Sequence, residues 1–486
     1  MKKHLYNIKA NLLIAFLFLF FACCSNSQEH IKVYQAPDGE ELSSMYEVTV
    51  EGSKIPVYPV KVGAEEQGRR WKAMDDPVSS AEYYDEAAFS YFDMNKPVLV
   101  EVKVPKEIIS AKILPSSAGI ASLIDGNTLS FRIEKPEKLT IKINGEKIKS
   151  LHIFANPFEE NIPDKNDPDV IYFGPGVHEI THLEIGDNKT LYIAGGAVLK
   201  AMIGADEKAI NTNPNGLKYY SPTIVLKGKN IKVKGRGIID ATNTPTHSRN
   251  MLVVEGEDIG VEGIILKDPS VWTVPVRHSK NVLIENIKII GYRANSDGID
   301  ICGSFDVEVN NCFIRTLDDL VVIKTLKGSG EAGRILVHRC VLWNELAHAL
   351  SIGAELTKDV SDVVFRDCDI IRDTGREWSL RVFQSDKALI SNIRFENIRI
   401  EESTKLISLW IGKNRWTNDD EGGNIRNITF KDIRAKGEPL TVEFTGYDND
   451  HKIDSVYFEN VTINGEKLDM SGIKKNEFVG DIFFKE

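Results

Sequence analysis

The sequence has few cysteines, no run of basic residues and no unusual content of glycine or proline. Lysine and arginine number 60 against 71 aspartates and glutamates, which gives a formal net charge of -11. Nucleic-acid phosphates are bound by clustered Lys and Arg, so an acidic chain without such a cluster is not expected to bind nucleic acid. The 36 glycines and 18 prolines exclude a collagen-like chain, and a hydrophobic content of 42% excludes a mostly disordered one.

The six cysteines are too few to build a disulfide scaffold in a chain of 486 residues. None of them lies in a CxxC or Cys/His spacing typical of a metal site. We therefore predict neither a metal centre nor a cofactor. Two cysteines are adjacent near the N-terminus, and the other four lie in the second half of the chain: Cys302, Cys312, Cys340 and Cys368.

Long apolar runs are absent except at residues 12–22, LLIAFLFLFFA, which follow three lysines. The run is shorter than the roughly 20 residues that span a membrane, but it suits the apolar region of a signal peptide. The next residues make FFAC at 20–23, which resembles a bacterial lipobox, where a cysteine after a small residue is lipidated.

We predict a lipoprotein signal peptide at 1–23 and lipidation of Cys23. The mature protein is then exported as an outer-membrane lipoprotein, periplasmic or at the cell surface, and contacts the membrane only through its lipid anchor. Two alternatives stay open, namely Cys24 as the acceptor and secretion without a lipid.

One pattern recurs nine times in the second half, with apolar residues alternating over a short stretch at a mean spacing of about 28 residues. Alternation with period two predicts a strand with one buried face, and the β-branched residues fit a pleated surface. Propeller blades are longer, and the Leu-rich signature of leucine-rich repeats is absent. The pattern therefore predicts a right-handed parallel β-helix with three short strands per rung. The repeats begin at Ile231, Ile259, Val282, Val307, Ile335, Val363, Ile393, Ile428 and Val456.

Two columns of the repeat predict how its rungs stack. Cys312, Cys340 and Cys368 are each 28 residues apart in an apolar column, so we interpret these thiols as stacked core side chains. The preceding column is rich in Asn and Asp, which indicates a turn, either with stacked side-chain hydrogen bonds or by simple turn preference. Its members are Asn286, Asn311, Asp367, Asn397, Asp432 and Asn460.

The first part of the chain alternates as strands without this period, for example at 97–104 and 139–145. We predict a small N-terminal β-sandwich at 24–158, a proline-containing linker at its end, and the parallel β-helix at 159–486 as the catalytic domain. The fold class is all-β.

Neighbouring rungs of a β-helix lie about 4.8 Å apart, so side chains in one sector of successive rungs are close in space. Counted from the start of each repeat, Asp297, Asp318, Asp319, His348 and Arg381 fall in one sector of four consecutive rungs. Two adjacent carboxylates in an apolar frame raise each other's pKa. A carboxyl group with a raised pKa is a general acid, and an ionised neighbour is a base.

These residues lie in motifs that resemble the clan of glycoside hydrolases holding the polygalacturonases (family 28) and the dextranases (family 49). The resemblance covers about residues 165–465. The sandwich followed by YFGPGVH and YIAGGAVLKA is more similar to the dextranase architecture. The motifs are DPSVWTV at 268–274, NSDGID at 295–300, LDDLVVIKT at 317–325, HALSIGAE at 348–355 and SLRVF at 379–383.

The resemblance implies a role for each matching residue. Asp318 corresponds to the general acid, and Asp297 and Asp319 to the acids that activate water for a single inverting displacement. His348 corresponds to a histidine that supports the protonation state of the acid, and Arg381 to a substrate-contacting arginine. The resemblance also assigns Asn295, Lys324 and Glu355 to the sugar-binding site.

The sequence departs from the polygalacturonase pattern at Phe383, where that family has the lysine that grips the uronate carboxylate. We therefore expect a neutral or differently charged glycan to be preferred over polygalacturonate. The function predicted is an inverting glycoside hydrolase acting on O-glycosidic bonds of a polysaccharide or oligosaccharide. Two alternatives are a polysaccharide lyase with Lys324 or Arg381 as the base, and a surface glycan-binding protein without catalysis.

Overall fold

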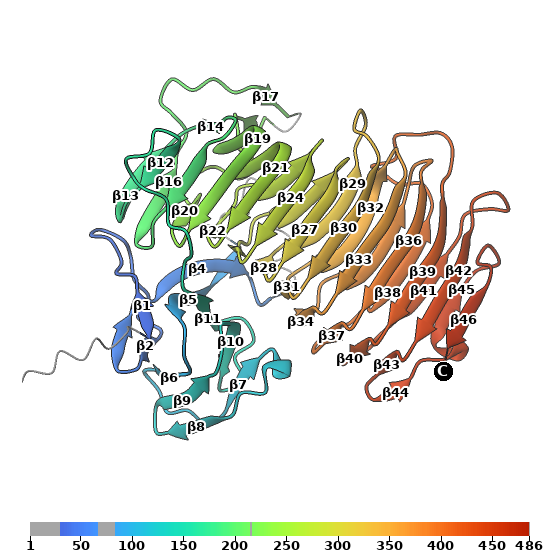
Figure 1. The fold of residues 1–486 in the computed structure, drawn as a ribbon. Helices are drawn as coiled ribbons and strands as arrows, with labels where there is room; N and C mark the ends of the chain where they lie inside the picture. The colour runs from blue at the N-terminus through green and yellow to red at the C-terminus, as the bar shows by residue number, and fades with distance from the viewer. Residues whose placement is uncertain (1–29, 67–82, 214–215, 486) are drawn as a thin grey trace, which may run out of the picture.

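The computed structural model describes residues 30–66, 83–213 and 216–485. The predicted signal peptide and Cys23 lie outside these residues. The described chain is nearly all β-structure and forms an N-terminal β-sandwich beside a long right-handed parallel β-helix, as the sequence predicted (Figure 1). Within these residues, no helix is long and apolar enough to cross a membrane.

The sandwich consists of two sheets that enclose an apolar core. Inward-facing residues of both sheets, such as Val48, Val100 and Ile141, are fully buried between them. One sheet contains β1 (Ile31–Val33), β4 (Tyr58–Gly63), β5 (Tyr84–Met94), β7 (Ala111–Leu114), β10 (Glu137–Ile143) and β11 (Leu151–Pro157). The other contains β2 (Glu47–Val50), β3 (Ser53–Ile55), β6 (Val98–Lys103), β8 (Ser122–Asp125) and β9 (Thr128–Ile133).

Each full rung of the β-helix contributes one strand to each of three parallel columns, and the core lies inside the coil. The first column carries the candidate site. It contains β14 (Leu183–Ile185), β23 (Val274–Arg277), β26 (Ile299–Cys302), β29 (Val321–Thr325), β32 (Leu350–Leu356), β35 (Leu380–Gln384), β38 (Ile407–Ile411), β41 (Val442–Thr445) and β45 (Ile473–Lys475). The long strands β19 (Ile224–Gly235) and β21 (Leu252–Glu262) belong to this column and to the next.

The second column follows the repeat found in the sequence. It contains β12 (Val170–Phe173), β15 (Thr190–Ile193), β24 (Lys280–Glu285), β27 (Phe305–Asn310), β30 (Ala332–His338), β33 (Val360–Arg366), β36 (Leu389–Glu396), β39 (Asn424–Lys431), β42 (Ile453–Glu459) and β46 (Ile482–Lys485).

The third column faces the sandwich. Its parallel strands are β13 (Gly176–Ile180), β16 (Ala197–Ala201), β20 (Ile238–Asp240), β22 (Ile265–Lys267), β25 (Lys288–Ile290), β28 (Phe313–Thr316), β31 (Val341–Asn344), β34 (Asp369–Asp373), β37 (Arg399–Ile400), β40 (Arg434–Ala435) and β43 (Thr462–Ile463). At its end, β44 (Glu466–Lys467) pairs antiparallel with β43. The hairpin of β17 (Asn211–Thr212) and β18 (Lys218–Tyr219) projects from the coil (Figure 1).

The stacked columns predicted from the sequence are present. Cys312, Cys340 and Cys368 are completely buried, each in the turn before a strand of the third column. The predicted Asn/Asp column occupies the left-handed region, for example Asn286 at φ 54° and Asp367 at φ 57°, where short polar side chains are tolerated. Its side chains form hydrogen bonds between neighbouring rungs only in part, such as Asn397 Nδ2 to Asp367 Oδ1 at 2.7 Å.

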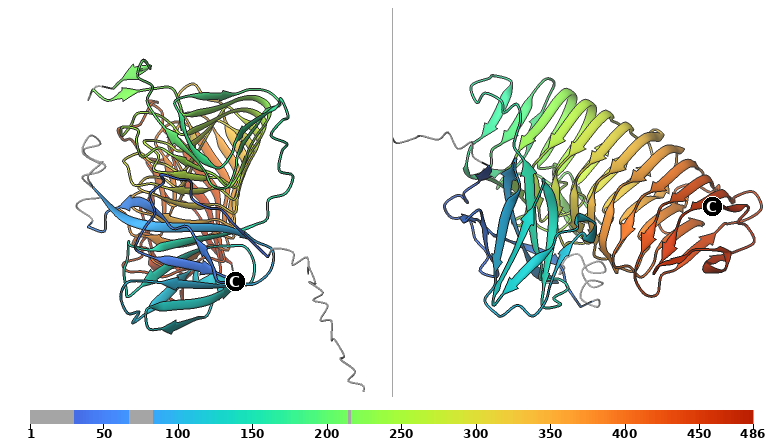
Figure 2. Two further views of the ribbon diagram at one scale, coloured as in Figure 1. Left: turned by 90° about the vertical axis from the view of Figure 1, so that its left-hand side faces the viewer. Right: turned by 60° about the horizontal axis from the view of Figure 1, so that its bottom comes forward.

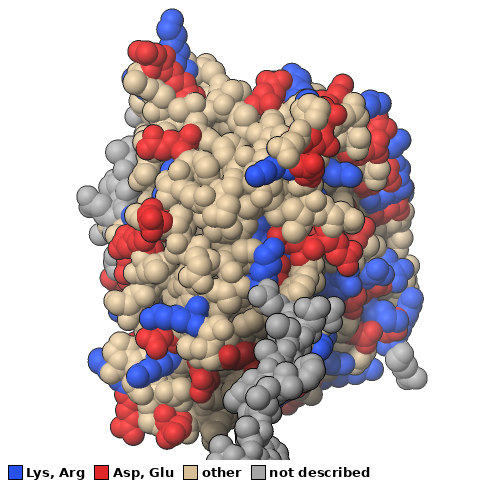
Figure 3. Space-filling model, turned by 60° about the vertical axis from the view of Figure 1, so that its left-hand side comes forward, with Lys and Arg blue, Asp and Glu red and all other residues tan. Residues whose placement is uncertain are grey.

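The sandwich packs against the third column at the N-terminal half of the coil (Figure 2). Aromatic residues of the sandwich, such as Phe89 and Phe154, pack on Phe313 and Trp343 of the coil. Buried polar contacts also join the domains, for example through Arg236 and Lys288. Arg236 Nε donates to Asp93 Oδ1 at 3.0 Å, and Lys288 Nζ donates to Asn156 Oδ1. On the face shown in Figure 3, acidic and basic side chains are interspersed.

Candidate active site

All of the predicted catalytic and sugar-binding residues line one pocket on the coil. Asp297 lies in the turn before β26, the Asp318-Asp319 pair in the turn before β29, and His348 in the turn before β32. Lys324, Glu355 and Arg381 lie on the strands of this column, and Asn295 in the turn with Asp297. Successive rungs thus bring together residues that are more than 80 positions apart in the sequence.

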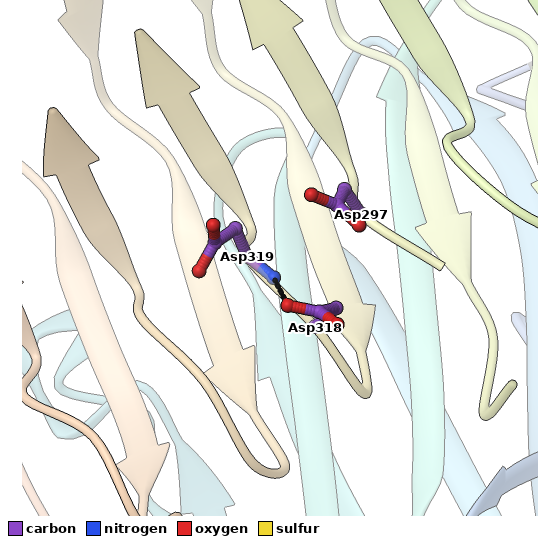
Figure 4. A group of neighbouring side chains, drawn as sticks. All are labelled: Asp297, Asp318 and Asp319. Atoms are coloured by element: carbon purple, nitrogen blue, oxygen red, sulfur yellow. Dashed lines mark hydrogen bonds between the residues drawn. The ribbon is translucent and has the colours of Figure 1, made fainter. Parts of the chain in front are cut away.

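The three aspartates converge, and one oxygen from each lies within 4.8 Å of the others (Figure 4). Adjacent residues in a strand point to opposite faces, so a pair can serve one site only where the chain leaves strand geometry. Residues 317–320 do so, because they form a bend between β28 and β29. The bend lets the Asp319 backbone N–H donate to Asp318 Oδ1 at 3.0 Å.

Gly298 explains why the two catalytic turns fit so closely. Its N–H donates to the carbonyl oxygen of Asp319 at 2.8 Å. A Cβ atom at this position would lie 2.3 Å from the carbonyl oxygen of Leu320, which is closer than any side chain tolerates. The glycine of the NSDGID motif therefore permits the close approach of the Asp297 turn to the Asp318-Asp319 turn.

His348 is held between Asp319 and Arg381. His348 Nδ1 lies 2.6 Å from Asp319 Oδ1, and Nε2 lies 2.9 Å from Arg381 Nη1. A guanidinium group only donates hydrogen bonds, so Nε2 accepts and Nδ1 donates its proton to Asp319. Arg381 Nη1 also donates to Glu377 Oε2 at 2.6 Å. Arg381 therefore orients His348 from within the wall of the pocket.

The two adjacent aspartates have opposite protonation preferences. Burial and the neighbouring charge of Asp319 raise the pKa of Asp318 to about 6. Burial also acts to raise the pKa of Asp319, but proximity to His348 and hydrogen bonds from its Nδ1 and backbone N–H hold that pKa below its ordinary value. Asp318 Oδ2 is buried and makes no hydrogen bond to the described residues. At mildly acidic pH the pair thus offers a protonated carboxyl group beside an ionised one.

Lys324 supplies the positive charge of the site. Its ammonium lies 3.3 Å from Asp300 Oδ1, 3.5 Å from Asp297 Oδ2 and 3.9 Å from Glu355 Oε2. Although burial acts to lower the pKa of Lys324, these carboxylates raise it well above its ordinary value. A lysine held in its charged form by these groups cannot abstract a proton, which counts against Lys324 as the base of a lyase.

Asp300 is a site residue that sequence reasoning did not single out, although it closes the NSDGID motif. It is buried beneath Asp297, and burial raises its pKa to about 7. Burial and the charge of Asp300 also raise the pKa of Asp297 well above its ordinary value, against the effect of Lys324. Asp297 and Asp300 therefore share the cation of Lys324 and, at mildly acidic pH, a proton.

Aromatic and further charged residues complete the walls of the pocket. The ammonium of Lys324 lies 4.2 Å from the ring centre of Trp272, and the guanidinium of Arg381 lies 3.9 Å from that of Phe383. Arg376 also lines the pocket, and two further charged residues, Glu377 and Arg415, were not predicted because they lie in loops that carry no motif. The guanidinium of Arg415 lies over the ring of exposed Trp416.

The Asp297-Asp318-Asp319 group is also the one set of acidic, His or Cys side chains, among the described residues, with ligand atoms close enough to hold a metal ion. Carboxylate oxygens suit Mg²⁺ or Ca²⁺. However, Lys324 already places a positive charge 3.5 Å from Asp297, and His348 satisfies Asp319. The Lys324 ammonium and His348 therefore already occupy part of the space and hydrogen-bonding capacity that a metal ion would need.

The described residues thus form a right-handed parallel β-helix with a pocket on its first column that is lined by acidic, basic and aromatic side chains. Comparison with known proteins identifies the family. The profile of glycosyl hydrolases family 28 matches residues 223–478, which is more than half of the chain. The chain therefore belongs to glycosyl hydrolases family 28, one of the two families of the clan that its motifs indicated.

Curated relatives support this assignment over part of their length. An endo-polygalacturonase from Pectobacterium carotovorum subsp. carotovorum is 30% identical over 188 residues, which cover 37% of this chain and 43% of the relative. A probable polygalacturonase from Vitis vinifera is 21% identical over 224 residues, which cover 43% and 44% respectively. The match thus spans less than half of each relative.

Solved structures show the same fold. Dex49A from Penicillium minioluteum superimposes with a TM-score of 0.56 at 15% identity, over 93% of this chain and 96% of that protein. An exopolygalacturonase from Thermotoga maritima superimposes with a TM-score of 0.54 at 18% identity, over 65% and 82%. The first likeness extends over almost the whole chain, so it includes the sandwich as well as the coil.

Proposed function

We propose that this protein is an inverting glycoside hydrolase that cleaves O-glycosidic bonds of a polysaccharide or oligosaccharide. The observation that carries the proposal is the contrast between adjacent carboxyl groups in one pocket, with the pKa of Asp318 raised to about 6 and that of Asp319 lowered. Membership of family 28 supports the same reaction class.

Asp318 protonates the glycosidic oxygen as the leaving sugar departs, using the buried Oδ2 that no described group engages. Asp319, ionised by its contact with His348, accepts the proton of the attacking water, and Asp297 helps to activate that water by orienting it. His348 and Arg381 keep Asp319 ionised and oriented. Lys324 balances the charge of Asp297 and Asp300 as protons move within the group.

The stereochemical outcome is the sharpest test of this mechanism. The oxygens within 4.8 Å of one another are closer than the roughly 6.5–9.5 Å typical of two inverting carboxyl groups. That separation alone suits a retaining pair, whereas the family motifs support inversion. Proton NMR of the first product released is expected to show the anomer opposite to the substrate. Retention of configuration would make Asp319 or Asp297 a nucleophile and overturn the inverting mechanism.

For the substrate, we expect a neutral or differently charged glycan to be preferred over polygalacturonate. Phe383 occupies the place of a uronate-gripping lysine, and its ring packs 4.8 Å from that of Trp410. Hydrolysis rates on dextran and other neutral glycans should exceed the rate on polygalacturonate. Rapid release of galacturonic acid would contradict this expectation and assign carboxylate binding to Arg376 or Arg415. An unsaturated uronide product would indicate a lyase, and binding without cleavage a glycan-binding protein.

Export and lipidation of Cys23 form a separate proposal. It rests on the positively charged start, the apolar run and the Ala22-Cys23 sequence. Replacement of the acceptor, Cys23→Ser, is expected to move the protein from the membrane fraction to the soluble fraction of the exporting cell. A variant that fractionates like the parent would exclude Cys23 as the lipid acceptor.

A further inference from the structure

The strand that leads to the Asp318-Asp319 turn carries a completely buried arginine, Arg315 on β28. Its Nε donates to Glu345 Oε1 at 2.9 Å, and Glu345 is completely buried as well. The guanidinium also stacks on the ring of Trp343, 3.9 Å from the ring centre. An ion pair without exposure to water sits directly beneath the catalytic turns.

The remaining nitrogens of Arg315 bind the sandwich. Nη1 donates to Ser150 Oγ at 2.9 Å and to His152 Nε2 at 3.1 Å, and Nη2 donates to the Ile148 carbonyl oxygen at 3.3 Å. Because Nε2 of His152 accepts, its Nδ1 donates to Thr140 Oγ1 at 2.9 Å. One side chain of the coil is thus fixed by residues before and on β11, and through His152 by β10.

Glu345 and its neighbour connect the Arg315 side chain to the catalytic turns by hydrogen bonds. Its backbone N–H donates to the carbonyl oxygen of Thr316 at 3.2 Å. The preceding residue, Asn344, donates from Nδ2 to the carbonyl oxygens of Asp318 at 2.9 Å and of His348 at 3.0 Å. Arg315 and Glu345 therefore lie at the start of both turns, and the Asn344 amide joins those turns to each other.

The sandwich also contacts the two turns directly. Tyr83, just before β5, packs against buried Leu317 and Leu346, one from each turn. At the end of β4, a Cβ atom on Gly63 would lie 3.1 Å from Glu345 carbon atoms. The backbone of the sandwich thus lies against the side chain that pairs with Arg315.

A buried ion pair contributes little net stability, since desolvation of both charges offsets their attraction. Its effect here is geometric, because the fork of the guanidinium fixes direction as well as distance. We propose that Arg315 and Glu345 are positioning residues through which the N-terminal sandwich sets the geometry of Asp318, Asp319 and His348. This inference rests on the proposed hydrolase function and adds the sandwich to the apparatus that performs it.

The test compares Arg315→Met/Glu345→Met with the parent, because replacing both partners avoids an unpaired buried charge. Arg236→Met/Asp93→Leu is the matched control, since it also removes both charges of a buried interdomain ion pair but has no contact with the catalytic turns. Kinetics use whichever of dextran and polygalacturonate the parent hydrolyses. The kcat of the double variant should fall roughly 100-fold, because a shift of catalytic groups by about 1 Å has an effect of this size. The KM should stay nearly unchanged. The control should keep the parent kcat.

A second measurement needs no substrate. Hydrogen exchange of the Leu320 and Leu346 amides, which bond to His348 O and Asn344 Oδ1, should accelerate in the double variant and not in the control. Parental kcat and exchange in a folded double variant would overturn the positioning role. Faster exchange with a parent that cleaves no glycan would overturn the proposed hydrolase function and leave the positioning of these turns supported.

Discussion

At the scale of single residues, the protonation states follow from partners rather than from burial alone. Asp318 and Asp319 are both buried, yet only Asp319 accepts hydrogen bonds from His348. The motif LDDLVVIKT predicted that both would serve one site. The sequence could not show that His348 bonds to Asp319, because the contact depends on the bend at 317–320 and on Arg381 two rungs away.

A substrate with a good leaving group should restore the activity that is lost when Asp318 can no longer donate a proton. Asp318→Asn keeps the shape of the side chain, and general acid catalysis contributes about 10²–10⁴-fold, so the rate on a natural glycan should fall by at least that factor. An aryl glycoside with an acidic phenol needs no protonation, and on it Asp318→Asn should recover much of the parent rate. Asp319→Asn is the control, because water activation is still required. Equal rescue of both variants would contradict these roles.

The activity should fall on the alkaline side of a mildly acidic optimum. Asp318 must carry its proton to act as the acid, and its pKa lies at about 6. Below that pH Asp318 is protonated, whereas above it each increase of one pH unit lowers the protonated fraction about tenfold. We expect the alkaline limb of kcat/KM near pH 6, measured with a stable buffer series at constant ionic strength. A profile that stays flat to pH 8 would exclude Asp318 as the acid.

At the scale of strands and turns, the sequence predicted the repeat well, but it predicted the columns of stacked side chains only in part. The apolar column with Cys312, Cys340 and Cys368 was visible because its spacing is regular. A second left-handed column, in the first half of the strands of the second column, was not predicted. Its side chains also bond from rung to rung, for example Asn392 Nδ2 to Asp362 Oδ1 at 3.0 Å. The column contains Asn, Asp and also Arg334, so no single residue type recurs that would have made it recognisable in the sequence.

The cysteine column should behave as hydrophobic core. Cys340 is completely buried between Cys312 and Cys368, and burial raises the pKa of Cys312 well above its ordinary value, so the Cys312 thiol stays protonated. Cys340→Val nearly conserves volume and should cost less than about 1.5 kcal/mol in the free energy of unfolding. Urea denaturation measures this cost. An inactive variant with parental stability would instead show that the thiol has a chemical role.

At the scale of the whole molecule, the sequence predicted two domains but not how they join. On the coil, the interface contains residues that look like ordinary strand residues in the sequence, such as Lys288 and Arg315. Both are completely buried, because Asn156 and Ser150 of the sandwich bind them. A single sequence shows the polar residue but not its partner more than 130 positions away. The sandwich therefore covers part of the third column of the coil and contacts the two catalytic turns from that side.

The joint between the domains should make them unfold together. Arg236→Met leaves Asp93 buried without its cation, and breaking a buried pair in this way costs about 3–5 kcal/mol. Arg236→Met/Asp93→Leu removes both charges and should recover most of that loss. In calorimetry, the parent should show one cooperative transition, and the single variant the same transition at a lower midpoint. Two resolved transitions in the parent, with only the first lowered by Arg236→Met, would show that the sandwich unfolds without opening the coil.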